Sequence, residues 1–169
     1  MSDRSIFNRT YTEFNAGGTV VYLVNGSSVQ TSLSRTQAFT AGETLAAGDA
    51  VYVSGTLAYK ASALSGVANF NYGVVGLTAN GGSTGSGIAV VIDDIVSVNS
   101  SNITAEAQLI PGSEYFLSKY YGQITRYSTG SGFVTNSGVN QYQALISVGK
   151  ALTTTELEVE IQSPIILVD

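Results

Sequence analysis

Two segments of this chain carry nearly the same pattern of glycines and apolar residues, and this repeat constrains the fold more than any other feature. Residues 48–59 begin with a turn glycine, continue as an aromatic and apolar run, reverse at Gly55 and return as a shorter run. Residues 112–118 and, after a short insertion, residues 122–127 repeat that order. Two such runs joined at a glycine predict a β-hairpin in each segment.

A second pair of matching runs follows each predicted hairpin. Residues 73–78 hold a glycine within an apolar run and precede the apolar residues 88–92, and residues 147–152 and 157–161 repeat this arrangement. The same order of runs therefore occurs twice, which predicts two related small β-modules in tandem. The alternative is that common turn chemistry alone produces the echo.

The repeat divides most of the chain into a first module, residues 37–98, and a second, residues 99–169. In the first, the glycine-rich segment 81–87 is interpreted as a flexible hairpin tip and residues 88–98 as one long strand. A polar stretch, residues 99–102, is expected to link the modules. Apolar residues alternate or run in blocks and turn residues recur throughout, so we expect an all-β protein of two small tandem modules of barrel or sandwich type.

The N-terminal part, residues 1–36, differs from the modules. Residues 19–24 predict a strand, and residues 29–33 could return beside it, whereas residues 1–16 show no period that would bury one face. We therefore expect an extended N-terminal arm that a partner orders. Its basic and aromatic residues are the candidates for contact with that partner: Arg4, Phe7, Arg9, Tyr11, Phe14 and Arg35. The alternative is that the arginines are simply solvated.

Charge is scarce in this sequence. Charged residues make up 11% and apolar residues 44%, whereas roughly a quarter of the residues of an ordinary domain are charged. A surface this poor in charge favours a protein that works within an assembly. The net charge of −5, with seven Lys and Arg residues, argues against nucleic acid as the partner. No run approaches the roughly 18 apolar residues of a membrane span, so no membrane partner is expected.

The residues of the common catalytic sites are missing or badly spaced. The chain has no His and no Cys, which excludes a Ser-His-Asp arrangement and the favoured zinc ligands. Ser147 and Lys150 have the spacing of lysine-activated serine enzymes, but that pairing needs a helical turn and the segment has a β pattern. Asp93 and Asp94 would project to opposite faces of a strand. We expect no enzyme activity, no metal and no cofactor.

Two further groups of residues have a plain structural interpretation. Glu156, Glu158 and Glu160 should share one face of a strand, where they keep an edge soluble or, with oxygens from a second chain, could hold calcium. The ten tyrosines could stack sugar rings, but tyrosine more often fills sheet faces and subunit contacts. For Tyr52 and Tyr115, which follow the turn glycines of the two hairpins, we expect equivalent positions in the core.

Parts of both modules resemble virion proteins of tailed bacteriophages. Residues 41–53 and 73–76 resemble the opening of small capsid cement, or head decoration, proteins. Residues 109–118, 122–125 and 148–152 are similar to a β-module appended to phage fibre and decoration proteins. The resemblance covers both modules but does not extend to the N-terminal arm.

This resemblance implies a homotrimer on the outer capsid surface of a virion, where it binds the major capsid protein and stabilises contacts between capsid subunits. The basic and aromatic arm residues are then candidates for capsid attachment. A head-fibre or receptor-binding protein that contacts a host surface glycan or protein is the alternative. The copy number per particle distinguishes the two roles, because a cement protein is present in hundreds of copies and a fibre in a few dozen or fewer.

Overall fold

A computed structural model of the protein describes residues 14–16, 19–24, 27–32, 35–63, 73–126 and 143–167. These residues form strands and a single 3₁₀ turn, η1 (Ser100–Asn102), so the described part of the chain is all-β, as the sequence predicts. No helix in these ranges has the length and apolar character that crossing a membrane requires. The chain forms two compact units, Met1–Arg35 and Thr36–Asp169.

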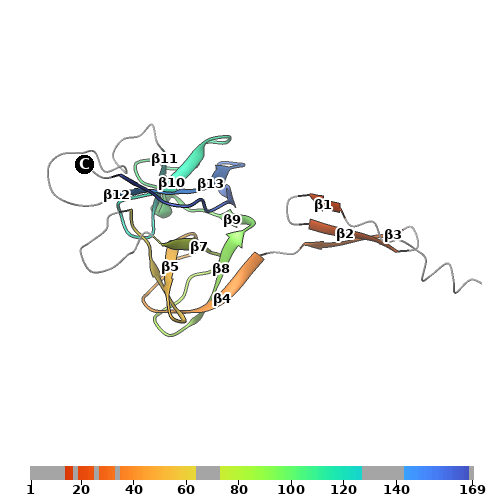
Figure 1. Ribbon diagram of the computed structural model, residues 1–169, viewed down its shortest axis with the longest axis horizontal. Coiled ribbons are helices and arrows are strands. Elements are labelled where there is room, and N and C mark those ends of the chain that lie inside the picture. Colours follow the sequence, from red (N-terminus) through yellow and green to blue (C-terminus); the bar gives the residue numbers. More distant parts are fainter. Residues whose placement is uncertain are drawn as a thin grey trace, which may run out of the picture. The chain divides into compact units, whose positions relative to one another are not determined.

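The first unit holds a three-stranded antiparallel sheet in the order β1-β2-β3 (Figure 1). Its strands are β1 (Phe14–Ala16), β2 (Thr19–Val24) and β3 (Ser27–Ser32). β2 and β3 pair along their whole length and form the hairpin that the sequence suggests. Phe14 in β1 pairs with Val21, so sheet structure begins inside the stretch predicted to be an extended arm. The part of that arm before Phe14 lies outside the described residues.

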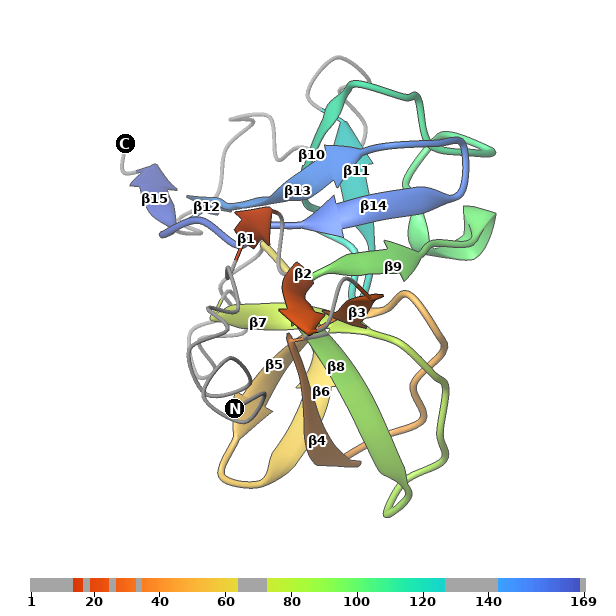
Figure 2. The same cartoon turned by 90° about the vertical axis from the view of Figure 1, so that its right-hand side faces the viewer.

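The second unit contains a closed barrel in the order β4-β6-β5-β7-β8 (Figure 2). Its strands are β4 (Arg35–Ala41), β5 (Ala50–Ser54), β6 (Leu57–Lys60), β7 (Val74–Thr78) and β8 (Gly87–Asp93). The backbone N–H of Ala41 donates to Ser86 at 2.8 Å, and the N–H of Gly85 donates to Ala41 at 2.7 Å. Leu45 and Gly82 exchange two further backbone bonds of 2.9 Å. The glycine-rich tip expected to be flexible is therefore held against β4 and the segment that follows it.

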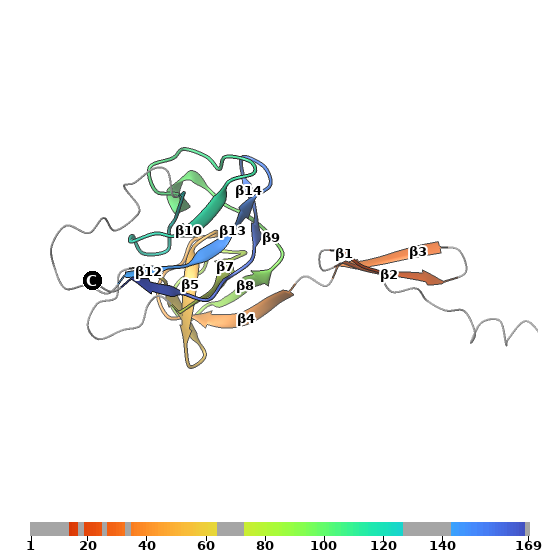
Figure 3. The same ribbon diagram turned by 45° about the horizontal axis from the view of Figure 1, so that its top comes forward.

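A five-stranded antiparallel sheet in the order β11-β10-β13-β14-β9 lies beside the barrel (Figure 2). Its strands are β9 (Ile95–Ser97), β10 (Glu114–Leu117), β11 (Ile124–Arg126), β13 (Ser147–Ala151) and β14 (Glu156–Val159). A separate antiparallel pair consists of β12 (Gln143–Leu145) and β15 (Ile165–Leu167) (Figure 3).

The prediction of one long strand over residues 88–98 is wrong. β8 ends at Asp93 in the barrel, and β9 begins at Ile95 in the second sheet. Between them, the Asp94 carboxylate accepts a hydrogen bond from the backbone N–H of Ile95 at 2.7 Å. Such a local bond competes with strand pairing, so the chain can change sheets at this aspartate. The predicted boundary after residue 98 thus falls after the chain has entered the second sheet.

The two sheets repeat one strand order, β6-β5-β7-β8 in the barrel and β11-β10-β13-β14 beside it. The register shifts directly after Val51 in β5 and directly after Tyr115 in β10. Val51 pairs with Gly76 and Tyr115 pairs with Gly149. At each glycine an added Cβ would collide with a carbonyl oxygen of the next strand, so both close approaches require glycine. The structure therefore confirms the tandem modules.

This register corrects the expected equivalence of Tyr52 and Tyr115. Tyr115 corresponds to Val51, and both are 0% exposed, whereas Tyr52 corresponds to Phe116 and both are half-buried. Successive residues of a strand face opposite sides, so a difference of one position reverses the direction of the side chain. The core position is confirmed for Tyr115. For Tyr52 it is wrong, because the ring lies at the margin of the core.

A single apolar core joins the barrel to the second sheet. Residues from both modules contribute to it, among them Ala50, Val74, Leu77, Val91, Tyr115, Ile124, Val148 and Leu157. A smaller cluster around Val51, Ala58 and Val90 fills the barrel interior. The two modules are thus repeats in sequence and strand order, but they share the larger part of their core.

Candidate functional site

The described part of the structure does not bring the predicted attachment residues together at one site. Phe14 begins β1, and the exposed Arg35 begins β4. The other candidates lie outside the described residues: Arg4, Phe7, Arg9 and Tyr11. Attachment through the N-terminal arm stays a prediction.

A buried polar cluster connects the barrel to the second module. Asp49, just before β5, is 5% exposed, and its Oδ1 accepts a hydrogen bond from Nδ2 of Asn102 at 2.7 Å. Its Oδ2 accepts one from the backbone N–H of Ala46 at 2.8 Å and lies 3.6 Å from Nζ of Lys60. We call Asp49, Asn102, Ala46 and Lys60 the junction cluster. Buried polar groups of this kind need hydrogen-bond partners. Asp49 of the first module and Asn102 of the second are such partners for each other.

The junction cluster corrects the expectation of a free polar linker over residues 99–102. Ser100–Asn102 forms η1, and the last residue of this turn, Asn102, is 1% exposed. Four polar residues in a row look like a solvated connection in the sequence. The fold instead buries the last of them, because its amide finds the Asp49 carboxylate across the module boundary.

The turn between β10 and β11 is longer than its counterpart in the barrel and docks on the barrel. Ser54 pairs with Leu57 across the β5–β6 turn, whereas Lys119, Tyr120, Tyr121 and Gly122 lie between Ser118 and its partner Gln123. The hydrogen bonds from this turn to the barrel side are Ser62 Oγ to Lys119 O at 2.7 Å, Ala63 N to Ser118 O at 2.9 Å, Gly122 N to Ala61 O at 2.8 Å and Ala50 N to Gly122 O at 2.9 Å.

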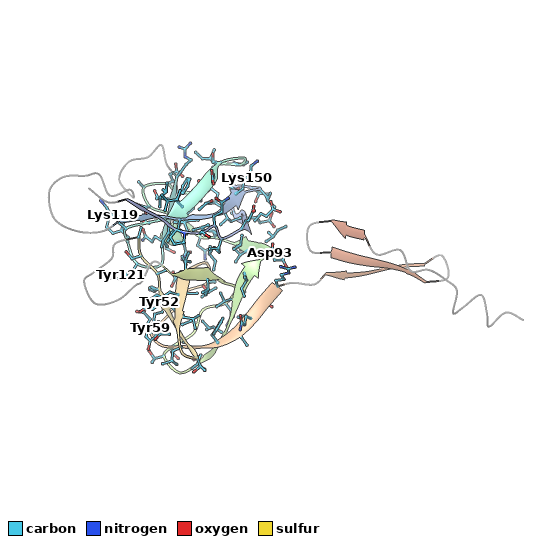
Figure 4. The ribbon with its side chains drawn as sticks, viewed as in Figure 1. Tyr52, Tyr59, Asp93, Lys119, Tyr121 and Lys150 are labelled. Atoms are coloured by element: carbon cyan, nitrogen blue, oxygen red, sulfur yellow. The ribbon has the colours of Figure 1, made fainter. Side chains whose placement is uncertain are left out.

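This longer turn brings Tyr121 to two tyrosines of the barrel (Figure 4). Tyr52 and Tyr59 are cross-strand partners in β5 and β6, and their stacked rings have centroids 5.6 Å apart and planes inclined by 24°. Burial, followed by the charges of Glu43, Tyr59 and Tyr121, raises the pKa of Tyr52. Tyr121 is 62% exposed. We call Tyr52, Tyr59 and Tyr121 the tyrosine platform.

In the second module a buried tyrosine has a structural rather than a surface role. The Tyr115 hydroxyl donates to Oε2 of Glu106 at 2.8 Å and accepts a hydrogen bond from the backbone N–H of Ile110 at 3.0 Å. Arg126 binds Oε1 of the same Glu106 through two nitrogens, at 2.8 and 2.9 Å. Burial and then the bond to Glu106 raise the pKa of Tyr115 to about 12. This phenol therefore stays protonated and holds the β10 hairpin to the preceding loop.

The pair with serine-enzyme spacing has no catalytic geometry. Ser147 and Lys150 lie on β13, where Ser147 is buried and donates to Oε1 of Glu114 at 2.7 Å, while Lys150 is exposed. An open depression of about 280 Å³ on this side of the second sheet is lined by Gly112, Glu114, Ser147, Gly149, Lys150, Glu160 and Gln162. It offers polar groups to solvent.

The carboxylates of β14 follow the predicted alternation. Glu156 and Glu158 are exposed, whereas Leu157 and Val159 are 0% exposed. Asp93 ends β8 and Asp94 lies between β8 and β9. The prediction that both aspartates lie in one strand is therefore wrong. Within the described ranges, no three His, Cys, Asp or Glu residues are grouped so that they could hold a metal ion.

A scan against protein-family models matched no family, and a search of curated proteins gave no match. Function is therefore inferred from the fold and its surfaces. Sequence reasoning missed the junction cluster, because Asp49 and Asn102 are far apart in the chain. It also missed the tyrosine platform, although the longer second hairpin, with adjacent tyrosines at Tyr120 and Tyr121, was a visible signal.

Proposed function

We propose that the protein is a capsid cement protein, which binds the outer surface of a phage head and stabilises contacts between major capsid subunits. The observation that carries this proposal is the separate N-terminal sheet. Among the described strands, β1, β2 and β3 pair only with one another, and β1 and β3 are the edges of their sheet. An edge strand offers main-chain groups to a strand of a partner protein.

The sequence of β2 supports the same function. It is apolar at every position from Val20 to Val24, a pattern typical of strands that are covered on both faces. A three-stranded sheet gains independent stability from a further apolar surface packed against it. In our proposal the capsid surface supplies part of this cover, and the arm residues before Phe14 extend the contact.

The second unit supports a function carried by shape rather than by chemistry. The shared core and the junction cluster make the barrel and the second sheet one body. A body that bridges neighbouring capsid subunits strengthens the shell, because separating the subunits then breaks the bridging contacts as well. We propose a homotrimer with no enzyme activity, since threefold symmetry suits the local threefold positions of a capsid lattice.

Deletion of residues 2–16 tests the attachment. The deletion removes β1 and the sequence before it, and leaves every described strand of the second unit intact. Added to empty heads of the phage that encodes the chain, the truncated protein should no longer bind, while its melting transition stays that of the second unit. Tyr121→Ala is the matched control, because it changes an exposed residue of the other unit and should leave head binding intact. Wild-type occupancy by the truncated protein would overturn the proposal.

Two measurements on the intact protein test the assembly. Light scattering after size exclusion at micromolar concentration should give the mass of a trimer, and a monomer that persists on concentration would contradict it. Densitometry of purified virions against the major capsid protein should give hundreds of copies per particle. A few dozen copies or fewer would indicate a head fibre instead.

A further inference from the structure

Tyr121 is the exposed ring of the tyrosine platform, whereas Tyr52 and Tyr59 are half-buried, and all three are held on hydrogen-bonded backbone. Tyr52 and Tyr59 sit opposite each other in the barrel wall, and the turn that carries Tyr121 makes hydrogen bonds to the barrel on both sides of that residue. Tyr121 nevertheless leaves 62% of its surface in solvent. Exposed aromatic rings on a fixed backbone lose little conformational entropy on binding, which favours ligand recognition.

The platform depends on two differences between the otherwise similar modules. Leu45 and Leu109 are equivalent buried leucines of the two modules. Three residues before them the first module has Gly42, whereas the second has Glu106. A Cβ at Gly42 would collide with the ring of Tyr59, so this glycine makes the room in which that ring lies. The longer β10–β11 turn, which carries Tyr121, is the second difference.

The charged groups beside the platform already have contacts within the protein. Nζ of Lys60 lies 3.6 Å from the Asp49 carboxylate, and Nζ of Lys119 lies 5.2 Å from the centroid of the Tyr120 ring. Glu43 accepts a hydrogen bond from the backbone N–H of Lys60 at 2.7 Å. Engaged cations offer little to a phosphate, which argues against a nucleotide or nucleic acid as the stacking ligand.

Flat rings and hydroxyl groups match the surface of a sugar. The face of an aromatic ring is negative and attracts the weakly positive C–H groups on the face of a pyranose. Phenol hydroxyls and a carboxylate such as Glu43 provide hydrogen-bond partners for sugar hydroxyls. We propose that the tyrosine platform binds a neutral glycan by stacking its pyranose rings on Tyr121 and on the Tyr52–Tyr59 pair. This inference does not depend on the capsid function, because the platform and the N-terminal sheet lie in different units.

Titration of the full chain with neutral oligosaccharides tests the proposal. The panel comprises oligomers of glucose, galactose, mannose and N-acetylglucosamine, with a short single-stranded oligonucleotide as the competing stacking ligand. Saturation-transfer NMR identifies binders and calorimetry gives the affinity. Tyr121→Ala should lower the affinity for the best oligosaccharide about tenfold or more, by analogy with the loss of other stacking rings. Tyr121→Phe keeps the ring and should stay within about threefold of the wild type.

Leu152→Ala is the matched control, since Leu152 is also an exposed apolar side chain, 41% accessible, but follows β13 in the second sheet. It should leave glycan affinity unchanged. Both substitutions are at exposed positions, so thermal melts should stay at the wild-type value. The proposal is overturned if no oligosaccharide binds, if the oligonucleotide alone binds, or if Tyr121→Ala leaves affinity intact. It is also overturned if Tyr121→Ala changes the oligomeric mass, which would make the platform a contact between copies of the chain.

Discussion

Asp49 offers the sharpest test of how the two modules are joined. Asp49→Ala removes the acceptor of two short hydrogen bonds, from Asn102 at 2.7 Å and from Ala46 at 2.8 Å. Hydrogen bonds to a charged group contribute about 1.5–3 kcal/mol each. The ion pair with Lys60 adds at most about 1 kcal/mol, because the lysine side chain is 31% exposed. These terms add to about 3–7 kcal/mol, and because such terms are not fully additive we expect the free energy of unfolding to fall by about 3–5 kcal/mol, as in other buried pairs that lose one partner.

Urea denaturation followed by tyrosine fluorescence and circular dichroism measures this loss. Asn102→Ala and the double variant complete a thermodynamic cycle, and the coupling between the two residues should be about 1–3 kcal/mol. Glu158→Ala is the control, because it removes an exposed carboxylate from β14 and should change stability by no more than about 0.5 kcal/mol. A loss below about 1 kcal/mol for Asp49→Ala, or a coupling near zero, would refute the view that this contact joins the modules.

Four further substitutions test the assigned environments of single residues. Tyr115→Ala should cost about 3–5 kcal/mol of stability, as for other buried aromatic truncations, and Tyr52→Ala clearly less, because its ring is half-buried; equal losses in urea denaturation would contradict the register. The pKa of Tyr115 is raised from 10.0 to about 12, so its stabilising effect is present below pH 10 and is lost as the pH rises through 12. Tyr115→Phe should lack this alkaline loss when stability is measured against pH. Ala105 has a φ of 63°, a left-handed conformation that glycine adopts more easily, so Ala105→Gly should raise stability by up to about 1 kcal/mol; a lower melting temperature would contradict this.

Local chemistry made the strands and their order predictable. The turn glycines and apolar runs located the hairpin strands β5 and β6, and the glycine-interrupted runs located β7 and β13. These elements are specified by residues close in the sequence, so a pattern alone can identify them. The same pattern could not give the register shift after Val51 and after Tyr115, which depends on pairing with distant strands. That shift is why Tyr52 was wrongly expected in the core.

The surfaces were less predictable than the strands. Asn102 looks like a solvated linker residue in the sequence, and it becomes buried because of a carboxylate that only the folded chain brings near it. Tyr121 joins Tyr52 and Tyr59 in the same way, through the docking of one hairpin turn on the other module. Contacts across a module boundary leave no periodic signal in either partner, so composition and spacing could suggest aromatic surfaces without locating one.

The position of β9 has a consequence for fragments of this protein. By sequence β9 lies in the first repeat, yet it pairs with β14 of the second, Ile95 opposite Glu158 and Val96 opposite Leu157. A fragment that ends at residue 98 would therefore present an orphaned strand, and a fragment that begins at residue 99 would present the vacant edge it fits. Mixed together, the two pieces should reassociate by complementation, and a chain strained between β8 and β9 could exchange this strand with a second molecule. Cleavage near residue 98 would thus leave two pieces that associate through β9 and β14 rather than two independent domains.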